Sequence, residues 1–140
     1  MGRSTDLQLV LGRLSDLPLA RFMDSRRIGL YGHSAGGTAT VYAARDDRRV
    51  GAVVNLEGYL DLYPKPAGLD QPLLLFRTDG FDGATRVESS WAGLPGRRVL
   101  LPDANHWAFT DYGSLVGPGD PAVTLAAVRR RVGTFFARHL

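Results

Sequence analysis

The chain has 140 residues, contains no cysteine and carries a formal net charge of +3. Its 44% of hydrophobic residues excludes a disordered segment and suits a single globular domain. The lack of cysteine excludes a disulfide scaffold, a thiolate zinc site and a cysteine nucleophile. No apolar run reaches the roughly 20 residues of a membrane span. The N-terminus shows no signal peptide, so we expect a cytoplasmic location if the chain is complete as given.

Cationic residues are spread along the chain, some of them as pairs, and their one cluster occupies 129–131. A nucleic-acid-binding module would need a continuous basic face interleaved with aromatic residues. The scattered pattern therefore argues against a nucleic-acid partner.

The predicted elements alternate along the chain. Apolar residues at i, i+3, i+4 and i+7 predict an amphipathic helix over residues 5–16, which Pro18 ends. Short apolar runs bounded by turns predict strands, and the segments between them have helical composition or spacing. In chain order, the further elements expected are a strand at 28–31, a helix at 35–45, strands at 50–56 and 73–76, a short helix at 84–92, a strand at 99–101 and a closing helix from 120 onward.

Near-continuous apolar strands that alternate with helices indicate parallel strands covered on both faces. We therefore predict an α/β fold, with a parallel sheet of about four strands and flanking helices, in one domain over residues 1–140. Loops are expected at 58–72, 78–83 and 102–119. Loops at the carboxyl ends of such strands gather at one edge of the sheet, where α/β proteins place their functional residues.

A G-x-S-x-G motif stands between the strand at 28–31 and the helix at 35–45, with Ser34 at its centre. This setting is typical of a nucleophile elbow, a tight turn that holds a serine hydroxyl above the sheet edge. The following helix begins with Ala35, whose N–H could donate to an oxyanion. A phosphate-binding glycine-rich turn is the alternative, but the spacing fits neither of the common phosphate and dinucleotide motifs. We therefore predict that Ser34 is a nucleophile.

Three histidines could supply the base that a serine nucleophile needs. His106 follows the fourth predicted strand, which places it on the same sheet edge as the elbow. It also fits the chain order serine, acid, histidine of such hydrolytic folds. His33 neighbours the serine and is expected to be structural and to point away from it, while His139 stands in the last turn of the closing helix. We predict that His106 is the base.

Chain order alone does not identify the acid that orients the imidazole. Glu57 directly follows the strand at 50–56, whereas Asp79 and Asp82 follow the third predicted strand. All three stand at carboxyl ends of strands and between the serine and His106. Chain order therefore does not choose between them.

Three segments resemble the α/β-hydrolases of the platelet-activating-factor acetylhydrolase type and their bacterial esterase and lipase relatives. They are the strand and elbow at 27–37, the next strand and acid at 51–58, and an H-x-x-F-x-D-aromatic segment at 106–112. The resemblance implies serine-dependent hydrolysis of a lipid-like or short acyl ester, without a cofactor or metal. It also implies that the acid is Glu57, at a position where the family typically has aspartate.

The resemblance further implies that part of the hydrolase fold is missing. Hydrolases of this type have a larger sheet, and the strands predicted here correspond to its last four. The early loop that supplies the second oxyanion donor is then absent, and loss of one donor typically costs about 10²–10³ in rate. The alternative function is a truncated, catalytically impaired remnant that acts through association. The strand at 28–31 would form an exposed edge through which we expect homodimers or other association.

Overall fold

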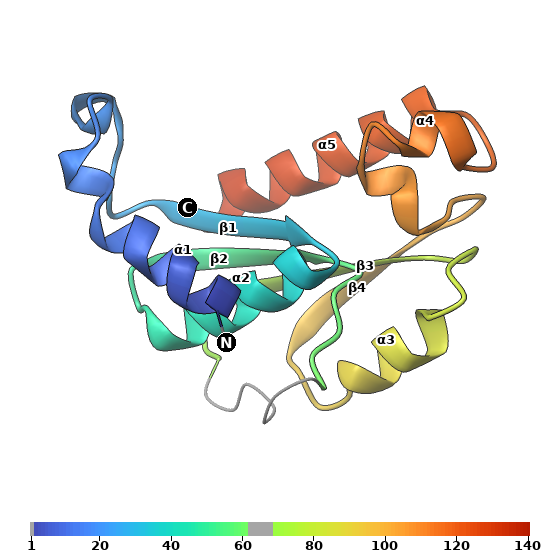
Figure 1. The fold of residues 1–140 in the computed structure, drawn as a ribbon, viewed down its shortest axis with the longest axis horizontal. Coiled ribbons are helices and arrows are strands. Elements are labelled where there is room, and N and C mark those ends of the chain that lie inside the picture. Colours follow the sequence, from blue (N-terminus) through green and yellow to red (C-terminus); the bar gives the residue numbers. More distant parts are fainter. Residues whose placement is uncertain (1, 62–68) are drawn as a thin grey trace.

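The computed structural model describes residues 2–61 and 69–140, and part of the predicted loop at 58–72 lies outside these residues. Strands and helices alternate along the described chain (Figure 1). The strands are β1 (Ile28–His33), β2 (Val50–Leu56), β3 (Leu73–Thr78) and β4 (Gly96–Leu101). The helices are α1 (Gly2–Gly12), α2 (Ala35–Asp46), α3 (Ala84–Ser90), α4 (Gly113–Val116) and α5 (Pro121–His139), with 3-10 turns η1 (Leu14–Asp16), η2 (Ala20–Phe22) and η3 (His106–Phe109). None of the helices in this part of the chain is long and apolar enough to cross a membrane.

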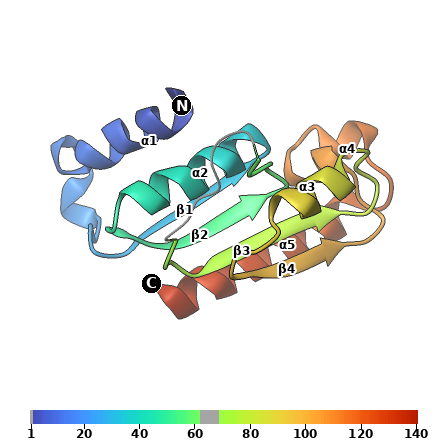
Figure 2. The same ribbon diagram turned by 90° about the horizontal axis from the view of Figure 1, so that it is seen from below.

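The four strands form one parallel sheet in the order β1-β2-β3-β4. Helices α1, α2 and α3 lie on one side of the sheet and α5 lies on the other (Figure 2). The predicted α/β fold, with parallel strands and helices on both faces, is confirmed. Because all strands run in the same direction, the segments that follow them meet at the carboxyl edge of the sheet.

Element boundaries differ from the predicted ones where polar residues enter the pattern. Helix α1 begins and ends earlier than expected, and η1 takes up the remaining residues. Strand β4 begins at Gly96, before the apolar run at 99–101, because an edge strand tolerates exposed side chains such as those of Arg97 and Arg98. The predicted loop at 102–119 contains η3 and α4, which are too short to show an apolar period.

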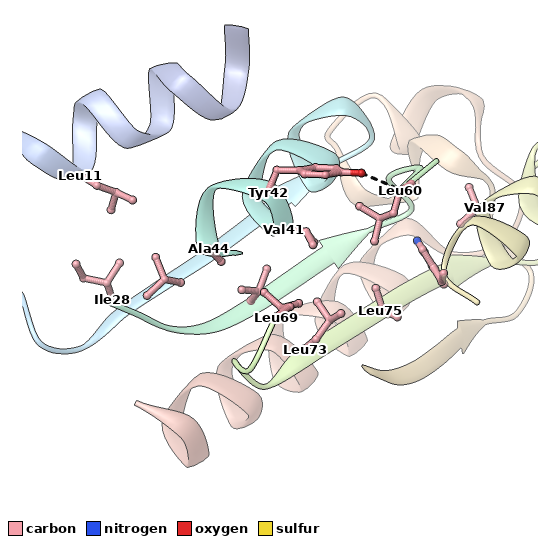
Figure 3. Close-up of a cluster of buried hydrophobic side chains, with 13 residues drawn as sticks. Leu11, Ile28, Val41, Tyr42, Ala44, Leu60, Leu69, Leu73, Leu75 and Val87 are labelled. Atoms are coloured by element: carbon pink, nitrogen blue, oxygen red, sulfur yellow. Dashed lines mark hydrogen bonds between the residues drawn. The ribbon is translucent and has the colours of Figure 1, made fainter. Parts of the chain in front are cut away.

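Two hydrophobic clusters hold the layers together. The larger lies between the sheet and α1–α3 and includes Leu11, Val41 and Val87 (Figure 3). The smaller lies between the sheet and α5. Adjacent residues such as Leu75 and Phe76 belong to opposite clusters, since strand side chains alternate between the two faces. The sheet therefore contributes one of its two faces to each hydrophobic cluster.

Strand β1 forms one edge of the sheet, and apolar surface lies beside it. The side chain of Tyr31 is 65% exposed. A groove of about 580 Å³ between α1 and β1 is lined by Leu7, Val10 and Leu14, among others. A second groove of about 320 Å³ continues from Leu7 and Val10 to Tyr31. The outer backbone groups of β1 have no strand partner within the described residues.

Candidate active site

The turn between β1 and α2 holds Ser34 in a backbone conformation that few residues adopt. Its φ is 54° and its ψ is −124°, and a positive φ at a residue with a side chain persists only when the surroundings enforce it. The Ser34 N–H donates to the Leu56 carbonyl at 2.9 Å, and the Ser34 carbonyl accepts from the Thr38 N–H at 3.1 Å. Backbone hydrogen bonds to β2 and within α2 therefore hold the turn on both sides. This is the strained strand–turn–helix geometry of a nucleophile elbow.

Glycines make this tight turn sterically possible. A Cβ on Gly32 would overlap the backbone of Gly36, and a Cβ on Gly58 would overlap the Ser34 carbonyl. The Gly58 N–H donates to Asn55 Oδ1 at 2.6 Å. The close approach of Gly58 to the Ser34 carbonyl packs the segment after β2 directly against the elbow. Gly36 itself has open space where a Cβ would stand. The first glycine of the motif is therefore required by its missing side chain, whereas the second contributes a closely packed backbone.

Strand register places the residues that follow β1, β2 and β3 side by side. His33 pairs with Leu56 across the β1–β2 ladder, so Ser34 and Glu57 occupy the next positions on neighbouring strands. Thr78 is the last residue of β3, the strand on the other side of β2. The parallel sheet thereby gathers the candidate nucleophile, a candidate acid and a threonine at one edge.

The Glu57 side chain is fully buried, and three donors surround its carboxylate. Oε1 accepts from the Thr78 N–H at 2.6 Å and from the Thr78 hydroxyl at 2.8 Å. Oε2 lies 2.9 Å from Nδ1 of His106. These hydrogen bonds offset the cost of burying the carboxylate. Because a carboxylate only accepts hydrogen bonds, the pair assigns the Nδ1 proton to His106 and leaves its Nε2 free to act as a base.

The alternative acids, Asp79 and Asp82, lie in the segment between β3 and α3, and within the described residues neither forms a hydrogen bond or ion pair with the imidazole. The Asp79 carboxylate accepts from the backbone N–H of Ala104 at 3.2 Å and from that of Asp103 at 3.0 Å. These hydrogen bonds, the one from Ala104 first, lower the pKa of Asp79. Asp82 is exposed. Asp79 therefore anchors the loop that leads into η3. The candidate acid that contacts the imidazole is Glu57, which follows β2.

Three aromatic side chains surround the His106 imidazole. Phe81 stacks on it with ring centroids 4.2 Å apart and planes inclined by 19°. The ring of His33 lies 4.4 Å away, and that of Trp107 lies 5.6 Å away, nearly edge-on. Sequence reasoning missed Phe81 and Trp107, because an isolated aromatic residue in a loop carries no periodic signal. Their packing restricts the orientation of the imidazole.

His33, expected to be structural and to point away from Ser34, has its ring against that of His106. Burial lowers the pKa of His33, and the neighbouring imidazole lowers it further. Its Nε2 is buried and has no hydrogen-bond partner within the described residues. The uncharged form of His33 is therefore favoured.

Ser34 and Ala35 supply the remaining groups of the candidate site. No hydrogen bond joins the Ser34 hydroxyl to His106 within the described residues, and in ligand-free enzymes such bonds often form only once substrate is bound. Ala35 is the first residue of α2, so its N–H has no intrahelical partner. Across residues 2–61 and 69–140, no group of three or more His, Asp or Glu side chains is arranged to hold a metal ion.

Comparison with known proteins gives structural matches. No protein-family model and no curated protein matches the chain. A ferulic acid esterase from Streptomyces cinnamoneus is 33% identical, with a TM-score of 0.81 over 99% of this chain and 48% of the esterase. A dienelactone hydrolase from Anabaena variabilis is 25% identical, with a TM-score of 0.75 over 98% of this chain and 59% of the hydrolase. DcsB, solved with a substrate analogue, is 15% identical, with a TM-score of 0.69 over 98% of this chain and 72% of DcsB.

The chain thus spans about half the length of the esterase and somewhat more of the dienelactone hydrolase. Both similarities extend over nearly all of its four-stranded sheet and flanking helices. The chain has an α/β-hydrolase fold.

Proposed function

We propose that the chain is a serine-dependent carboxylic ester hydrolase. The observation that carries this proposal is the strained backbone of Ser34 at the sheet edge that also holds the buried Glu57, hydrogen-bonded to the partly buried His106. Strained residues cluster at active sites, where the surrounding structure maintains them. The similarity to an esterase and a dienelactone hydrolase supports the same chemistry.

In the proposed reaction, the Ser34 hydroxyl attacks the ester carbonyl while Nε2 of His106 takes its proton. His106 returns the proton to the departing alcohol, and the acyl group stays on Ser34. His106 then activates a water molecule that releases the carboxylic acid and restores the serine. Glu57 holds the imidazole tautomer and stabilises its charged form. The Ala35 N–H and the positive end of the α2 dipole stabilise the oxyanion.

An ester with an apolar part suits the surface beside the imidazole. Trp107 is 46% exposed and Tyr112 is 50% exposed, and their ring centroids lie 5.3 Å apart. Similarity to a protein named ferulic acid esterase favours an aromatic acyl group. The resemblance to platelet-activating-factor acetylhydrolases favours a lipid-like or short acyl ester instead. Exposed aromatic rings could pack against the apolar part of either substrate.

The second candidate function is an impaired hydrolase remnant that acts through association. The open edge of β1 and the two apolar grooves beside it favour this candidate. The two functions differ in the reactivity of Ser34, because only a competent elbow and base make the hydroxyl nucleophilic.

Labelling by a fluorophosphonate probe and hydrolysis of p-nitrophenyl butyrate test the proposal. We expect the native chain to be labelled and Ser34→Ala to lose labelling, with a loss of hydrolysis on the order of 10⁴-fold or more. Ser114→Ala, which removes an exposed hydroxyl in α4, is the matched control and should keep both activities. Full hydrolysis by a folded Ser34→Ala chain would contradict the assignment. A folded native chain without labelling would favour the impaired remnant.

A further inference from the structure

A groove of about 460 Å³ lies between α5 and the amino-terminal parts of β3 and β4. Pro72 and Pro95 stand just before these two strands and line it. The candidate active site occupies the carboxyl ends of the strands, so the groove is at the opposite end of the sheet. Its volume is within the range of small-molecule sites, roughly 300–1,000 Å³. The groove is therefore large enough to hold a ligand of its own.

The polar side of the groove is strongly cationic. Arg97 enters it from β4, while Arg130, Arg131 and Arg138 enter it from α5. No acidic residue is among the described residues that line it. None of these four arginines forms an ion pair or a side-chain hydrogen bond within the described part of the chain. Seven other arginines, by contrast, each have a carboxylate partner among the described residues.

The floor of the groove is apolar. Leu74, Val99 and Phe135 line it, and all three belong to the hydrophobic cluster between the sheet and α5. Strand alternation explains the arrangement, because Arg97 and Val99 project from the same face of β4. Helix periodicity explains the other wall, because Arg130 and Arg138 are eight residues apart on one face of α5. Guanidinium groups from two elements thus surround an apolar surface.

We propose that this groove binds a small anion with an apolar body, such as a carboxylate or phosphate joined to an alkyl or aryl group. The unpaired guanidinium groups would form charge-assisted hydrogen bonds with the anionic head. The body would cover the exposed parts of Val99 and Phe135. An anion would also relieve the mutual repulsion of four neighbouring positive charges. The proposal concerns binding and does not depend on hydrolysis at Ser34.

Calorimetric titration with sodium octanoate tests this inference, with acetate as the head alone and octan-1-ol as the body alone. We expect saturable binding of one octanoate per chain, at least about tenfold tighter than either partial ligand. Arg130→Gln and Arg97→Gln should each weaken octanoate binding by about tenfold. Arg129→Gln is the matched control, because Arg129 is exposed on the same helix but does not line the groove. It should change the affinity by less than about twofold.

Circular dichroism and the thermal midpoint establish that each variant is folded before titration. Equal losses in Arg129→Gln and Arg130→Gln would overturn the proposal, because they would show an unlocalised charge effect. Equal affinity for acetate and octanoate would overturn the role of the apolar floor. Arginine-dependent binding to vesicles that contain anionic lipid, without binding of octanoate, would replace the small-molecule site with a membrane-contact surface.

Discussion

Thr78 has a specific task at the scale of single residues, because it donates twice to Glu57 Oε1. One of these hydrogen bonds comes from its backbone and the other from its hydroxyl, so a side-chain substitution removes one and keeps the other. Thr78 is fully buried, and no water can replace the missing donor without a cavity. We infer that Thr78 is a positioning residue that acts on His106 through Glu57.

Thr78→Val should therefore lower kcat/KM by about tenfold, since a buried carboxylate that loses a hydrogen bond is destabilised by about 1–3 kcal/mol. Thr78→Ser keeps the hydroxyl and should restore most of the activity. The NMR resonance of the His106 Nδ1 proton should shift in the valine variant and return in the serine variant. Unchanged resonance and activity in a folded Thr78→Val chain would remove Thr78 from the site.

Glu57 and Asp79 allow a second test, because both follow strands and both accept two or more hydrogen bonds. Glu57→Gln should lower kcat on p-nitrophenyl butyrate on the order of 10⁴-fold, as an amide in this position favours the wrong imidazole tautomer. Asp79→Asn removes the same charge and should lower kcat far less, since its hydrogen bonds hold a loop. The reverse order of losses would assign the acid to the β3–α3 segment.

At the scale of elements, the β1–α2 turn depends on close backbone packing. Gly32→Ala should destabilise the fold strongly, because the added Cβ would overlap the backbone of Gly36. Backbone atoms in this turn, unlike the end of a flexible side chain, have little room to move away. Gly36→Ala places a methyl group in open space on the first turn of α2. Alanine in place of a helical glycine stabilises by roughly 0.5–1 kcal/mol.

Chemical denaturation of the two glycine variants measures this difference directly. We expect a lower denaturant midpoint for Gly32→Ala and an equal or higher midpoint for Gly36→Ala. If both substitutions cost the same free energy of unfolding, the turn would not have the packing described above.

At the scale of the whole molecule, the two sheet edges differ. The β4 edge carries the exposed side chains of Arg97 and Arg98, which disfavour pairing with another strand. The β1 edge carries the exposed ring of Tyr31 and adjoins two apolar grooves, both of which are lined by Leu7 and Val10. An open strand edge beside apolar surface is a template for pairing with another chain. We therefore propose that the β1 edge mediates homodimerisation or other association.

Sedimentation velocity over a concentration series tests this proposal. We expect the native chain to associate as its concentration rises into the micromolar range. Tyr31→Lys puts a charge on the open edge and should reduce the association, whereas Leu100→Lys puts the same charge at an exposed position on β4 and should not. A monomer at all concentrations, or equal effects of the two substitutions, would show that β1 is not the contact.

Much of the fold was predictable from local signals, because hydrophobic periodicity and turn residues report on the nearest neighbours in the chain. The strand at 50–56 matches β2 to the residue, since it is fully apolar at its centre and buried on both faces. The apolar run at 99–101 predicts only the second half of β4, because at a sheet edge the polar residues Arg97 and Arg98 extend the strand without an apolar signal. The 3-10 turn η3 has a capping residue, Asn105, whose side chain accepts from the Trp107 N–H, but its four residues are too few to show a helical period.

The sequence by itself determined the alternating order of elements, the parallel α/β architecture and the position of Ser34 in a strand–turn–helix motif. Each of these was read from local sequence patterns, in which the residues concerned are close together in the chain. The family resemblance implied Glu57 as the acid, but only the tertiary structure showed its contact with His106, because the two are 49 residues apart and meet through strand register and loop packing. The same holds for the stacking of Phe81 on the imidazole and for the convergence of Arg97 with the arginines of α5. Chain order limits such contacts to a few candidates, and the distances between separate elements select among them.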